Sequence, residues 1–301
     1  MSLPCIAVMA PGDMGHAVGR ALREHGHDVI TCLAGRSTRS RGLAETAGLR
    51  DVADLDALVS QAALVLSILP PAQALNQARD MSAAMGRTGA RPVYVDCNAV
   101  SPATMAEVAA ILDGISAPVL DVGIIGTGPT PTNVTRFYVS GDDTAPLQAL
   151  DGKGIKVIPV DGGIGRASGL KMAYAGLTKG TNALYTAVLM AAEQMGLFDV
   201  LVAEFEDSQA AALKNMRARV ARLPADAGRW TREMEEIAAT FRAAGVPGDF
   251  HDGAAAVFRI LAATPFGAET RETIDAGRTM EASVREFVRH LPGGARDAAD
   301  D

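Results

Sequence analysis

The chain has 301 residues, of which 48% are hydrophobic, and it carries a formal net charge of −7 at pH 7. This length is enough for two domains, and the apolar content excludes wholesale disorder. The negative charge argues against nucleic acid or an anionic membrane as a partner, although a small anion can still bind in a local basic pocket.

Three cysteines are present, at Cys5, Cys32 and Cys97. They lie in apolar, strand-like segments and lack the spacing of metal ligands, so we expect buried reduced thiols, no metal site and a cytoplasmic protein. The apolar run over residues 3–10 leads directly into a glycine turn, which favours a strand over a signal peptide. No apolar run approaches the roughly 18 residues of a membrane span.

Short apolar runs alternate with helical patterns through the first half of the chain. This alternation, with strands apolar on both sides, predicts a doubly wound parallel sheet of the α/β class. From residue 166 to 289 only helical periodicity is found. We therefore expect a Rossmann-type domain over residues 1–161, an all-helical domain over 162–292 and a flexible tail over 293–301. Strands are expected at residues 5–9, 28–33, 62–69, 93–96, 119–125, 136–140 and 156–160, and helices at 14–24, 40–47 and 102–112.

The segment Ala10–Gly15, APGDMG, follows the first strand and opens the first helix. A dinucleotide-binding turn belongs at this place in an α/β sheet. Gly12 would let the backbone approach a pyrophosphate, and Gly15 would let helix and strand pack closely. The helix then presents its free N–H groups, with Asp13 and Met14 in the first turn, to the phosphates. The first glycine of the usual pattern is an alanine here.

The second strand leads into a basic segment, LAGRSTRSR. An NAD site needs an acid near this position to bind the ribose 2′-hydroxyl, and none lies between Asp28 and Glu45. Guanidinium and hydroxyl groups suit a 2′-phosphate instead, so we expect NADP, held by Arg36, Ser37 and Arg39. The alternative is a solvated basic loop on an acidic protein.

Three further loops follow the carboxyl ends of strands, where such sheets bind ligands. The loop with Leu69 and Pro70 is expected beside the nicotinamide, and the loops over residues 96–102 and 121–128 are expected to floor the substrate pocket. Ordinary strand-end turn chemistry, with Ser101 capping the next helix, explains these loops equally well. The contacts expected from them are Asn98 for the cofactor, and Ser101, Gly123 and Gly126 for the substrate.

A long helix is predicted from about residue 167 to 195. One of its faces carries a polar stripe that holds no acid until Glu193, whereas a solvated face would carry several charges. We therefore expect the stripe to line a pocket in which Lys171 meets a substrate oxygen. The stripe consists of Lys171, Tyr174, Thr178 and Asn182, and the positions away from it, expected in the core, are Ala173, Leu177 and Leu184.

These features resemble the β-hydroxyacid dehydrogenases, the superfamily that includes 6-phosphogluconate dehydrogenase. The resemblance is carried by the N-terminal glycine turn, the strand end DCNAVSP, the glycine segment after Asp121 and the GIG that leads to Lys171. LKMAYAGLTKG and RWTREMEE resemble the branch with a C-terminal domain of unknown function. The resemblance implies that Lys171 is the catalytic acid or base and that the helical domains form an interlocked homodimer.

Two positions depart from the family pattern. The asparagine that usually follows the lysine by four residues is Ala175, which leaves Tyr174 as the nearest polar neighbour. The substrate-binding serine of the glycine segment is Ile125. The resemblance therefore implies an NADP-dependent oxidoreductase acting on a small carbonyl or hydroxy-acid substrate. An imine reductase and a non-catalytic NADPH sensor are the alternatives.

The predicted helical domain offers two more candidate substrate contacts. Trp230 is the single tryptophan, and His251 lies in the segment GDFHDG, which has the composition of a turn. Either side chain could reach the pocket. The competing interpretations are a core position for the tryptophan and a solvent-facing position for the histidine.

Overall fold

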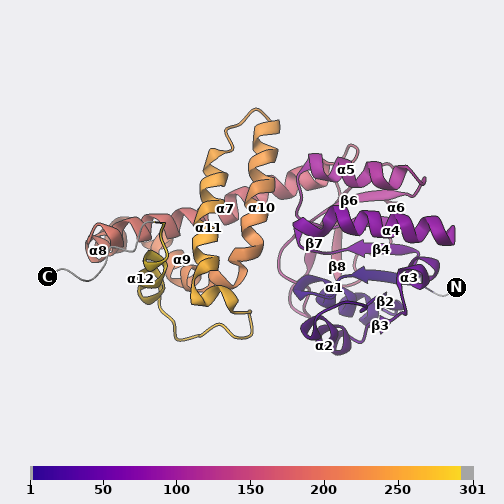
Figure 1. Cartoon of the computed structure of the whole chain (residues 1–301), viewed down its shortest axis with the longest axis horizontal. Helices are drawn as coiled ribbons and strands as arrows, with labels where there is room; N and C mark the ends of the chain where they lie inside the picture. The colour runs from indigo at the N-terminus through magenta and orange to yellow at the C-terminus, as the bar shows by residue number, and fades with distance from the viewer. Residues whose placement is uncertain (1–2, 293–301) are drawn as a thin grey trace. The chain divides into compact units, whose positions relative to one another are not determined.

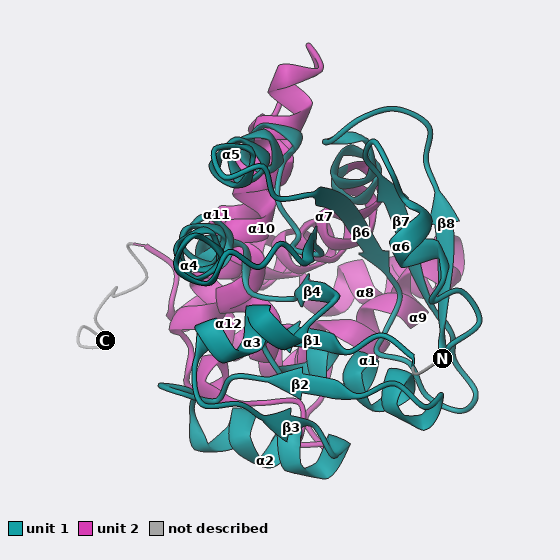
Figure 2. Ribbon diagram, turned by 90° about the vertical axis from the view of Figure 1, so that its right-hand side faces the viewer, with its two compact units in different colours: residues 1–172 teal, residues 173–301 magenta. Residues whose placement is uncertain are grey.

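The computed structural model describes residues 3–292, so the predicted tail lies outside the described residues. The chain divides into two compact units, the first ending at Met172 and the second beginning at Ala173 (Figure 2). Among the helices of the described residues, none combines the length and apolar character needed to cross a membrane.

The first unit is built on one eight-stranded sheet with the order β3-β2-β1-β4-β5-β6-β7-β8 (Figure 1). All neighbouring strands run parallel except β6 and β7, which are antiparallel. The predicted doubly wound α/β sheet is thereby confirmed, with one antiparallel pair in addition. The strands are β1 (Ile6–Met9), β2 (Val29–Thr31), β3 (Arg50–Asp51), β4 (Leu64–Ser67), β5 (Val93–Asp96), β6 (Val119–Ile125), β7 (Thr135–Ser140) and β8 (Ile155–Pro159).

Helices cover both faces of this sheet (Figure 2). Side chains alternate along β1, so that Ile6 and Val8 join a core under α1, α2 and α6, whereas Ala7 and Met9 join a core under α3, α4 and α5. Burial on both faces explains why the strands read as continuous apolar runs. The helices are α1 (Asp13–Glu24), α2 (Thr38–Ala47), α3 (Leu55–Gln61), α4 (Ala74–Thr88), α5 (Pro102–Asp113) and α6 (Ala145–Gln148), with a 3₁₀ turn η1 (Pro71–Gln73).

The sheet reverses its strand order between β1 and β4, because β2 and β3 lie on one side of β1 and the later strands lie on the other. Ligands of doubly wound sheets bind at the carboxyl ends of the strands at such a switch point. Met9 and Ser67, the last residues of β1 and β4, are register partners there.

The second unit is all-helical, as the sequence predicts. α10 and α11 form an antiparallel pair (Figure 1). The units divide inside α7, beyond the expected join near residue 161, because the first turns of α7 pack on the sheet. The elements are α7 (Arg166–Gln194), α8 (Phe198–Ser208), α9 (Ala210–Arg219), η2 (Val220–Arg222), α10 (Pro224–Ala243), α11 (Asp249–Ala263), η3 (Pro265–Ala268) and α12 (Met280–Arg289).

Candidate functional site

The glycine turn between β1 and α1 has the form that the sequence predicts. A Cβ on Gly15 would lie 2.0 Å from the carbonyl oxygen of Ala10, so only glycine fits where the helix crosses the strand end. A Cβ on Gly12 would meet nothing within 4 Å, so this backbone is open to a ligand. Gly12 is the N-cap of α1 without a side-chain cap, and the Nδ1 of His16 donates to its carbonyl oxygen at 2.8 Å. The first N–H groups of α1 are therefore presented to an anion.

Side chains of the basic segment after β2 hold the turn together. Ser37 is the N-cap of α2 and accepts from the Ser40 N–H at 3.2 Å. Arg41 donates to the carbonyl oxygen of Leu33 at 2.6 Å, and the Leu33 N–H donates to Asp51 at 2.9 Å. The turn is thus fixed by its own residues, and Ser37 serves as a cap.

The two arginines predicted to read the cofactor differ in their partners. Arg39 forms an ion pair with Asp13, in the first turn of α1, at 2.5 Å. Arg36 is half-buried, and within residues 3–292 its guanidinium has no hydrogen-bond or ion-pair partner. Arg36 is therefore the cation of this turn that can bind an added anion without giving up another contact.

Asn98 clamps the ends of β4 and β5 together. It is 2% exposed; its Oδ1 accepts from the Leu69 N–H at 2.6 Å, and its Nδ2 donates to Ser67 at 3.1 Å and to Asp96 at 2.9 Å. Because these bonds use both ends of the carboxamide, the side chain positions the Leu69 loop. Pro70, also predicted beside the cofactor, is exposed next to it.

A row of four buried polar residues crosses the sheet below these loops. Ser67, Asp96, Asp121 and Ser140 are register partners on β4, β5, β6 and β7, and none is more than 1% exposed. Burial, together with the charge of Asp121, raises the pKa of Asp96 to about 7, while hydrogen bonds from Asn98 oppose the rise. Sequence reasoning placed these carboxyls at strand ends without recognising the row.

Asp121 fixes the start of α7 to the sheet. Its carboxylate accepts from the Gly165 N–H at 2.9 Å, from the Ser168 N–H at 3.0 Å and from the Ser168 hydroxyl at 2.5 Å. Burial raises the pKa of Asp121, and these donated hydrogen bonds oppose the rise. A carboxylate at a helix N-terminus satisfies the free N–H groups there, so Asp121 orients the helix that carries Lys171.

Lys171 lies against the carboxyl end of β6. A Cβ on Gly123 would lie 2.7 Å from the Ala167 carbonyl oxygen and 2.9 Å from the Lys171 Cβ, so glycine at this position lets α7 approach the strand. The amine of Lys171 then reaches the carbonyl oxygen of Ile124 at 2.7 Å. Gly123 thus allows close packing of the helix. From the sequence, its backbone had been expected to contact a substrate.

The other predicted loop contacts have local structural roles. Ser101 is the N-cap of α5 and accepts from the Thr104 N–H at 3.2 Å, as the capping alternative predicts. Gly126 is exposed and has a φ of 121°, a conformation that favours glycine. Ser101 and Gly126 belong to the first unit. So do the glycine turn, the two arginines, Asn98 and Lys171.

The remaining predicted residues belong to the second unit. Tyr174 is 44% exposed, and the Thr178 hydroxyl donates back to its carbonyl oxygen at 3.2 Å. Trp230 is half-buried and packs edge-on against Phe258, with ring centroids 5.3 Å apart.

His251 corrects the sequence interpretation. It lies in the first turn of α11, 5% exposed, between the rings of Phe241 and Phe250 at 4.3 and 5.3 Å. The expected turn is a helix because Gly248 caps it and two aspartates stabilise its N-terminus. Burial lowers the pKa of His251, which keeps the ring neutral.

The apolar positions of α7 give a second correction. Leu177 and Leu184, expected in the core, are 71% and 47% exposed, and Ala173 is exposed as well. Met172 and Ala175 are buried instead. The helix is apolar on two sides, so periodicity alone could not tell which side packs within the chain.

A buried ion pair in the second unit was missed from the sequence. The Lys179 amine pairs with Glu233 of α10, and their side chains are 12% and 2% exposed. The amine also lies 5.4 Å from the Trp230 ring centroid. Burial lowers the pKa of Lys179, and the carboxylate of Glu233 opposes this. Lys179 lies in the same glycine-rich segment as Lys171, but only the helical fold reveals its partner on α10.

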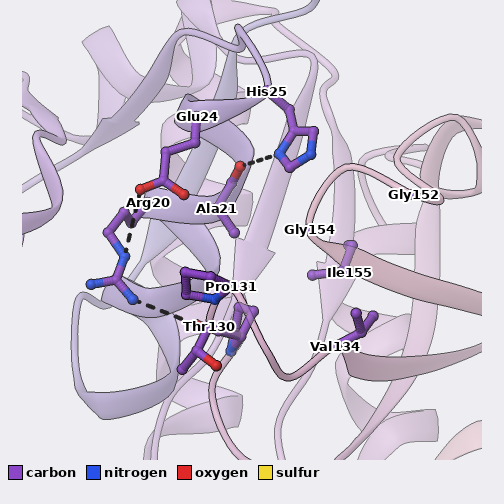
Figure 3. Close-up of a pocket in the computed structure, with 11 residues that line it drawn as sticks. Arg20, Ala21, Glu24, His25, Thr130, Pro131, Val134, Gly152, Gly154 and Ile155 are labelled. Atoms are coloured by element: carbon purple, nitrogen blue, oxygen red, sulfur yellow. Dashed lines mark hydrogen bonds and ion pairs between the residues drawn. The ribbon is translucent and has the colours of Figure 1, made fainter.

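A cavity of about 270 Å³ in the first unit lies apart from all these groups (Figure 3). It flanks the C-terminal half of α1, where Arg20 donates to the Pro129 carbonyl oxygen at 3.5 Å and His25 donates to that of Ala21 at 2.7 Å. None of the residues predicted for the site lines it. The glycine turn is at the opposite end of the helix.

Comparison with known proteins agrees with this arrangement. Residues 5–151 match the NAD binding domain of 6-phosphogluconate dehydrogenase, and residues 192–261 match a domain of unknown function, DUF1932. The chain therefore carries the pair of domains expected from its resemblance to the β-hydroxyacid dehydrogenases, with a nicotinamide-dinucleotide-binding domain first. It is an NAD(P)-dependent dehydrogenase or reductase by class, which confirms the resemblance read from the sequence.

The similar proteins and solved structures are distant from this chain in sequence. An uncharacterized 28.5 kDa protein of Methanothermus fervidus is 28% identical over 60% of this chain and 68% of its own length. The protein MTH1747, of unknown function and described as structurally similar to 3-hydroxyacid dehydrogenases, is 25% identical over 86% of this chain and 96% of its own, with a TM-score of 0.62. A Mycobacterium tuberculosis 3-hydroxyisobutyrate dehydrogenase shares the fold, at 17% identity over 94% and 98% of the two chains and a TM-score of 0.65.

Proposed function

We propose that this chain is an NADP-dependent oxidoreductase that transfers hydride between NADPH and a small carbonyl or hydroxy-acid substrate, with Lys171 as general acid and base. One observation carries the proposal. The Lys171 amine reaches the Ile124 carbonyl oxygen at 2.7 Å, at the carboxyl end of β6, and the glycine turn follows the same end of β1. A proton donor therefore lies at the sheet edge where ligands of this fold bind.

The residues of the turn fit a dinucleotide. Gly12 leaves room for a pyrophosphate, and the N–H groups of Asp13, Met14 and Gly15 would hold it. Arg36, with Arg39 and the Ser37 hydroxyl beside it, supports NADP over NAD, because its guanidinium has no partner among the described residues. Asn98 would act here by holding the loop of Leu69 and Pro70 in place for the nicotinamide half.

The chemistry divides between cofactor and chain. Reduced nicotinamide supplies the hydride when it is bound. Lys171 holds a proton at Nζ, stabilises the negative charge that develops on the substrate oxygen and donates the proton to it. Tyr174, three residues further on the same helix, is the second candidate proton donor, and Ser101, Gly126, Thr178, Trp230 and His251 stay proposed substrate contacts.

A turnover screen tests the proposal. The full chain is mixed with NADPH or NADH and a panel of keto acids, aldehydes and cyclic imines, and oxidation is followed at the nicotinamide absorbance. We expect turnover with NADPH on at least one carbonyl acid. Tight NADPH binding without oxidation across the panel would contradict the proposal in favour of a sensor, and turnover restricted to imines would reassign the substrate.

We propose further that the chain is a homodimer joined through α7 and α8. Apolar side chains are exposed there, including Leu184 at 47%, Met195 at 64% and Val200 at 68%. A monomer seldom leaves such a set in water, because each buried side chain would gain about 1.5–3 kcal/mol. Sedimentation should give a dimer for the wild type and a monomer for Leu184→Asp/Val200→Asp. The control Val134→Asp, on the first unit, should stay dimeric, and a monomeric wild type at micromolar concentration would refute the assembly.

A cytoplasmic location is part of the same proposal. Cys32 and Cys97 are buried, and all three cysteines are free thiols. Burial raises the pKa of the Cys5 thiol to about 11 and also raises that of Cys97 well above its ordinary value. Inert reduced thiols are compatible with a reducing compartment.

A further inference from the structure

The second unit contains a polar cavity of about 210 Å³ between α7 and α9. No acidic side chain lines it, and Leu177 is the apolar member of its lining. The polar groups of its lining are Thr178, Thr181, Asn182 and Tyr185 from α7, and Asn215 and Arg219 from α9. The cavity therefore combines one positive charge with several neutral hydrogen-bonding groups.

Asn182 is the buried polar group of this cavity. The residue is only 5% exposed, yet within residues 3–292 its carboxamide has no hydrogen-bond partner. The Thr186 hydroxyl donates to the backbone carbonyl oxygen of Asn182 at 2.9 Å, and this bond does not involve the carboxamide. Because this carboxamide lines the cavity and makes no bond within the described chain, its oxygen and its N–H groups are available to a ligand there.

Arg219 supplies the charge. It is exposed, and its guanidinium has no ion-pair or hydrogen-bond partner in the described part of the chain. Arg217, two residues earlier on α9, differs because it pairs with Glu206 at 2.6 Å and does not line the cavity. The positive charge at the cavity is thus uncompensated, while that of its neighbour is already neutralised.

We propose that this cavity binds a small hydroxy-monocarboxylate. Arg219 offers a planar fork for the carboxylate. A phosphate monoester would bring close to two negative charges against this one cation, so a monocarboxylate balances the charge better. The amides and hydroxyls of Asn182, Asn215 and Tyr185 both donate and accept, which suits a hydroxyl group, and Leu177 contacts the aliphatic carbon. A volume of about 210 Å³ suits a short acid.

The cavity is separate from the reacting group proposed above. Eleven residues, or about three turns of α7, separate Lys171 from Asn182, and Lys171 does not line the cavity. Thr178, a proposed substrate contact, does line it, but none of the groups assigned to the acid is a proposed substrate contact. The proposal therefore does not rest on the oxidoreductase function. A hydroxy-monocarboxylate group could belong to a longer substrate or to an effector that resembles the substrate.

Calorimetric titration of the full chain with 3-hydroxybutyrate tests the site. We expect binding that becomes at least tenfold weaker in Arg219→Gln and in Asn182→Asp, which adds a repelling charge. Arg217→Gln is the matched control and should bind as the wild type does, and 3-hydroxybutyramide, which lacks the carboxylate, should not bind. Absence of binding, equal binding of the amide or an unchanged affinity in Arg219→Gln would overturn the proposal.

Two further arms separate this site from the reaction. Lys171→Met should bind the acid normally, and loss of binding there with retention in Arg219→Gln would overturn the proposal by moving the acid to the reacting group. Failure of every substrate in the turnover screen would end the oxidoreductase assignment without changing this binding result. In an active enzyme, a raised KM in Arg219→Gln supports a substrate subsite, and an unchanged KM with retained binding supports an effector site.

Discussion

Two lysines on α7, eight residues apart, have opposite surroundings. Lys171 is half-buried at the carboxyl end of β6 and donates to a neutral carbonyl, that of Ile124. Lys179 is buried within the second unit, where it pairs with the carboxylate of Glu233 beside the Trp230 ring. A carboxylate beside a buried amine favours its charged form, whereas an amine at a ligand-binding edge can exchange its proton with a ligand. We therefore propose that the first lysine takes part in the reaction and that the second stabilises the fold.

The largest effect is expected at Lys171. We predict that Lys171→Met, Lys171→Ala and Lys171→Arg each lose about 10²- to 10⁴-fold in turnover, because none can supply the proton. Binding of NADPH and the midpoint of urea unfolding should stay as in the wild type. Steady-state kinetics and fluorescence titration measure these quantities, with Lys214→Met on the exposed side of α9 as the control. An active Lys171→Met enzyme would transfer the role to Tyr174.

For Lys179→Met we expect the opposite result, a lower free energy of unfolding. Removing the amine from this buried pair takes away the cation that balances the Glu233 carboxylate, at a cost of about 3–5 kcal/mol in the free energy of unfolding. The double variant Lys179→Met/Glu233→Leu removes both charges and should recover most of that loss. Urea unfolding of the three proteins measures the cycle. If Lys179→Met unfolds like the wild type but loses turnover, the assignment of the two lysines is inverted.

Asp96 extends the comparison to a buried acid that has no cationic partner among the described residues. Its pKa is raised from an ordinary 3.8 to about 7, so the folded state holds a proton that the unfolded state releases. The stability from this proton is fully present below about pH 4 and is lost as the pH rises through about 7. Because three pKa units correspond to about 4 kcal/mol at most, we expect a decline of a few kcal/mol over this range.

The variant Asp96→Asn should flatten that decline. The amide cannot ionise, so the free energy of unfolding should lose the part of its pH dependence that Asp96 contributes between pH 4 and 7. Urea unfolding at several pH values measures it, with Asp113→Asn on the exposed end of α5 as the control. Identical slopes in Asp96→Asn and the wild type would show that Asp96 is ionised throughout.

The smallest effect concerns a free and a paired arginine. Arg36→Ala should weaken NADPH binding about tenfold to a hundredfold and leave NADH nearly unchanged, since a charge-assisted contact contributes about 1.5–3 kcal/mol. Arg39→Ala should cost less, because Arg39 already pairs with Asp13. Fluorescence titration compares the two variants with Arg79→Ala on α4. Equal affinity of the unmutated protein for NADPH and NADH would contradict the proposal that Arg36 binds the 2′-phosphate of NADPH.

The sequence predicts the first unit in more detail than the second for a physical reason. Strands buried on both faces, glycines that a Cβ would displace and a capping serine are local signals, so β1, the glycine turn and the Ser101 cap were predictable. Helices α3, α4 and α6 were not predicted. In α4 much of the buried face is alanine, such as Ala74 and Ala78, which gives weak periodicity.

Long-range partners explain the remaining differences. The pairing of Lys179 with Glu233 joins positions 54 residues apart, and the burial of His251 depends on rings from α10 and α11. The Asn98 clamp and the Asp121 anchor likewise join separate strands and helices. A sequence pattern shows which residue types are present at each element, and only the fold shows which of them meet.

The most direct test of the central claim is a crystal structure of the full chain with NADPH and an unreactive analogue of the carbonyl acid found in the screen. We expect the Lys171 amine to lie within about 3.2 Å of the analogue's carbonyl oxygen, and the nicotinamide to lie at the carboxyl ends of β1 and β4. A structure in which that oxygen is bound by another side chain while Lys171 stays on the Ile124 carbonyl would contradict it.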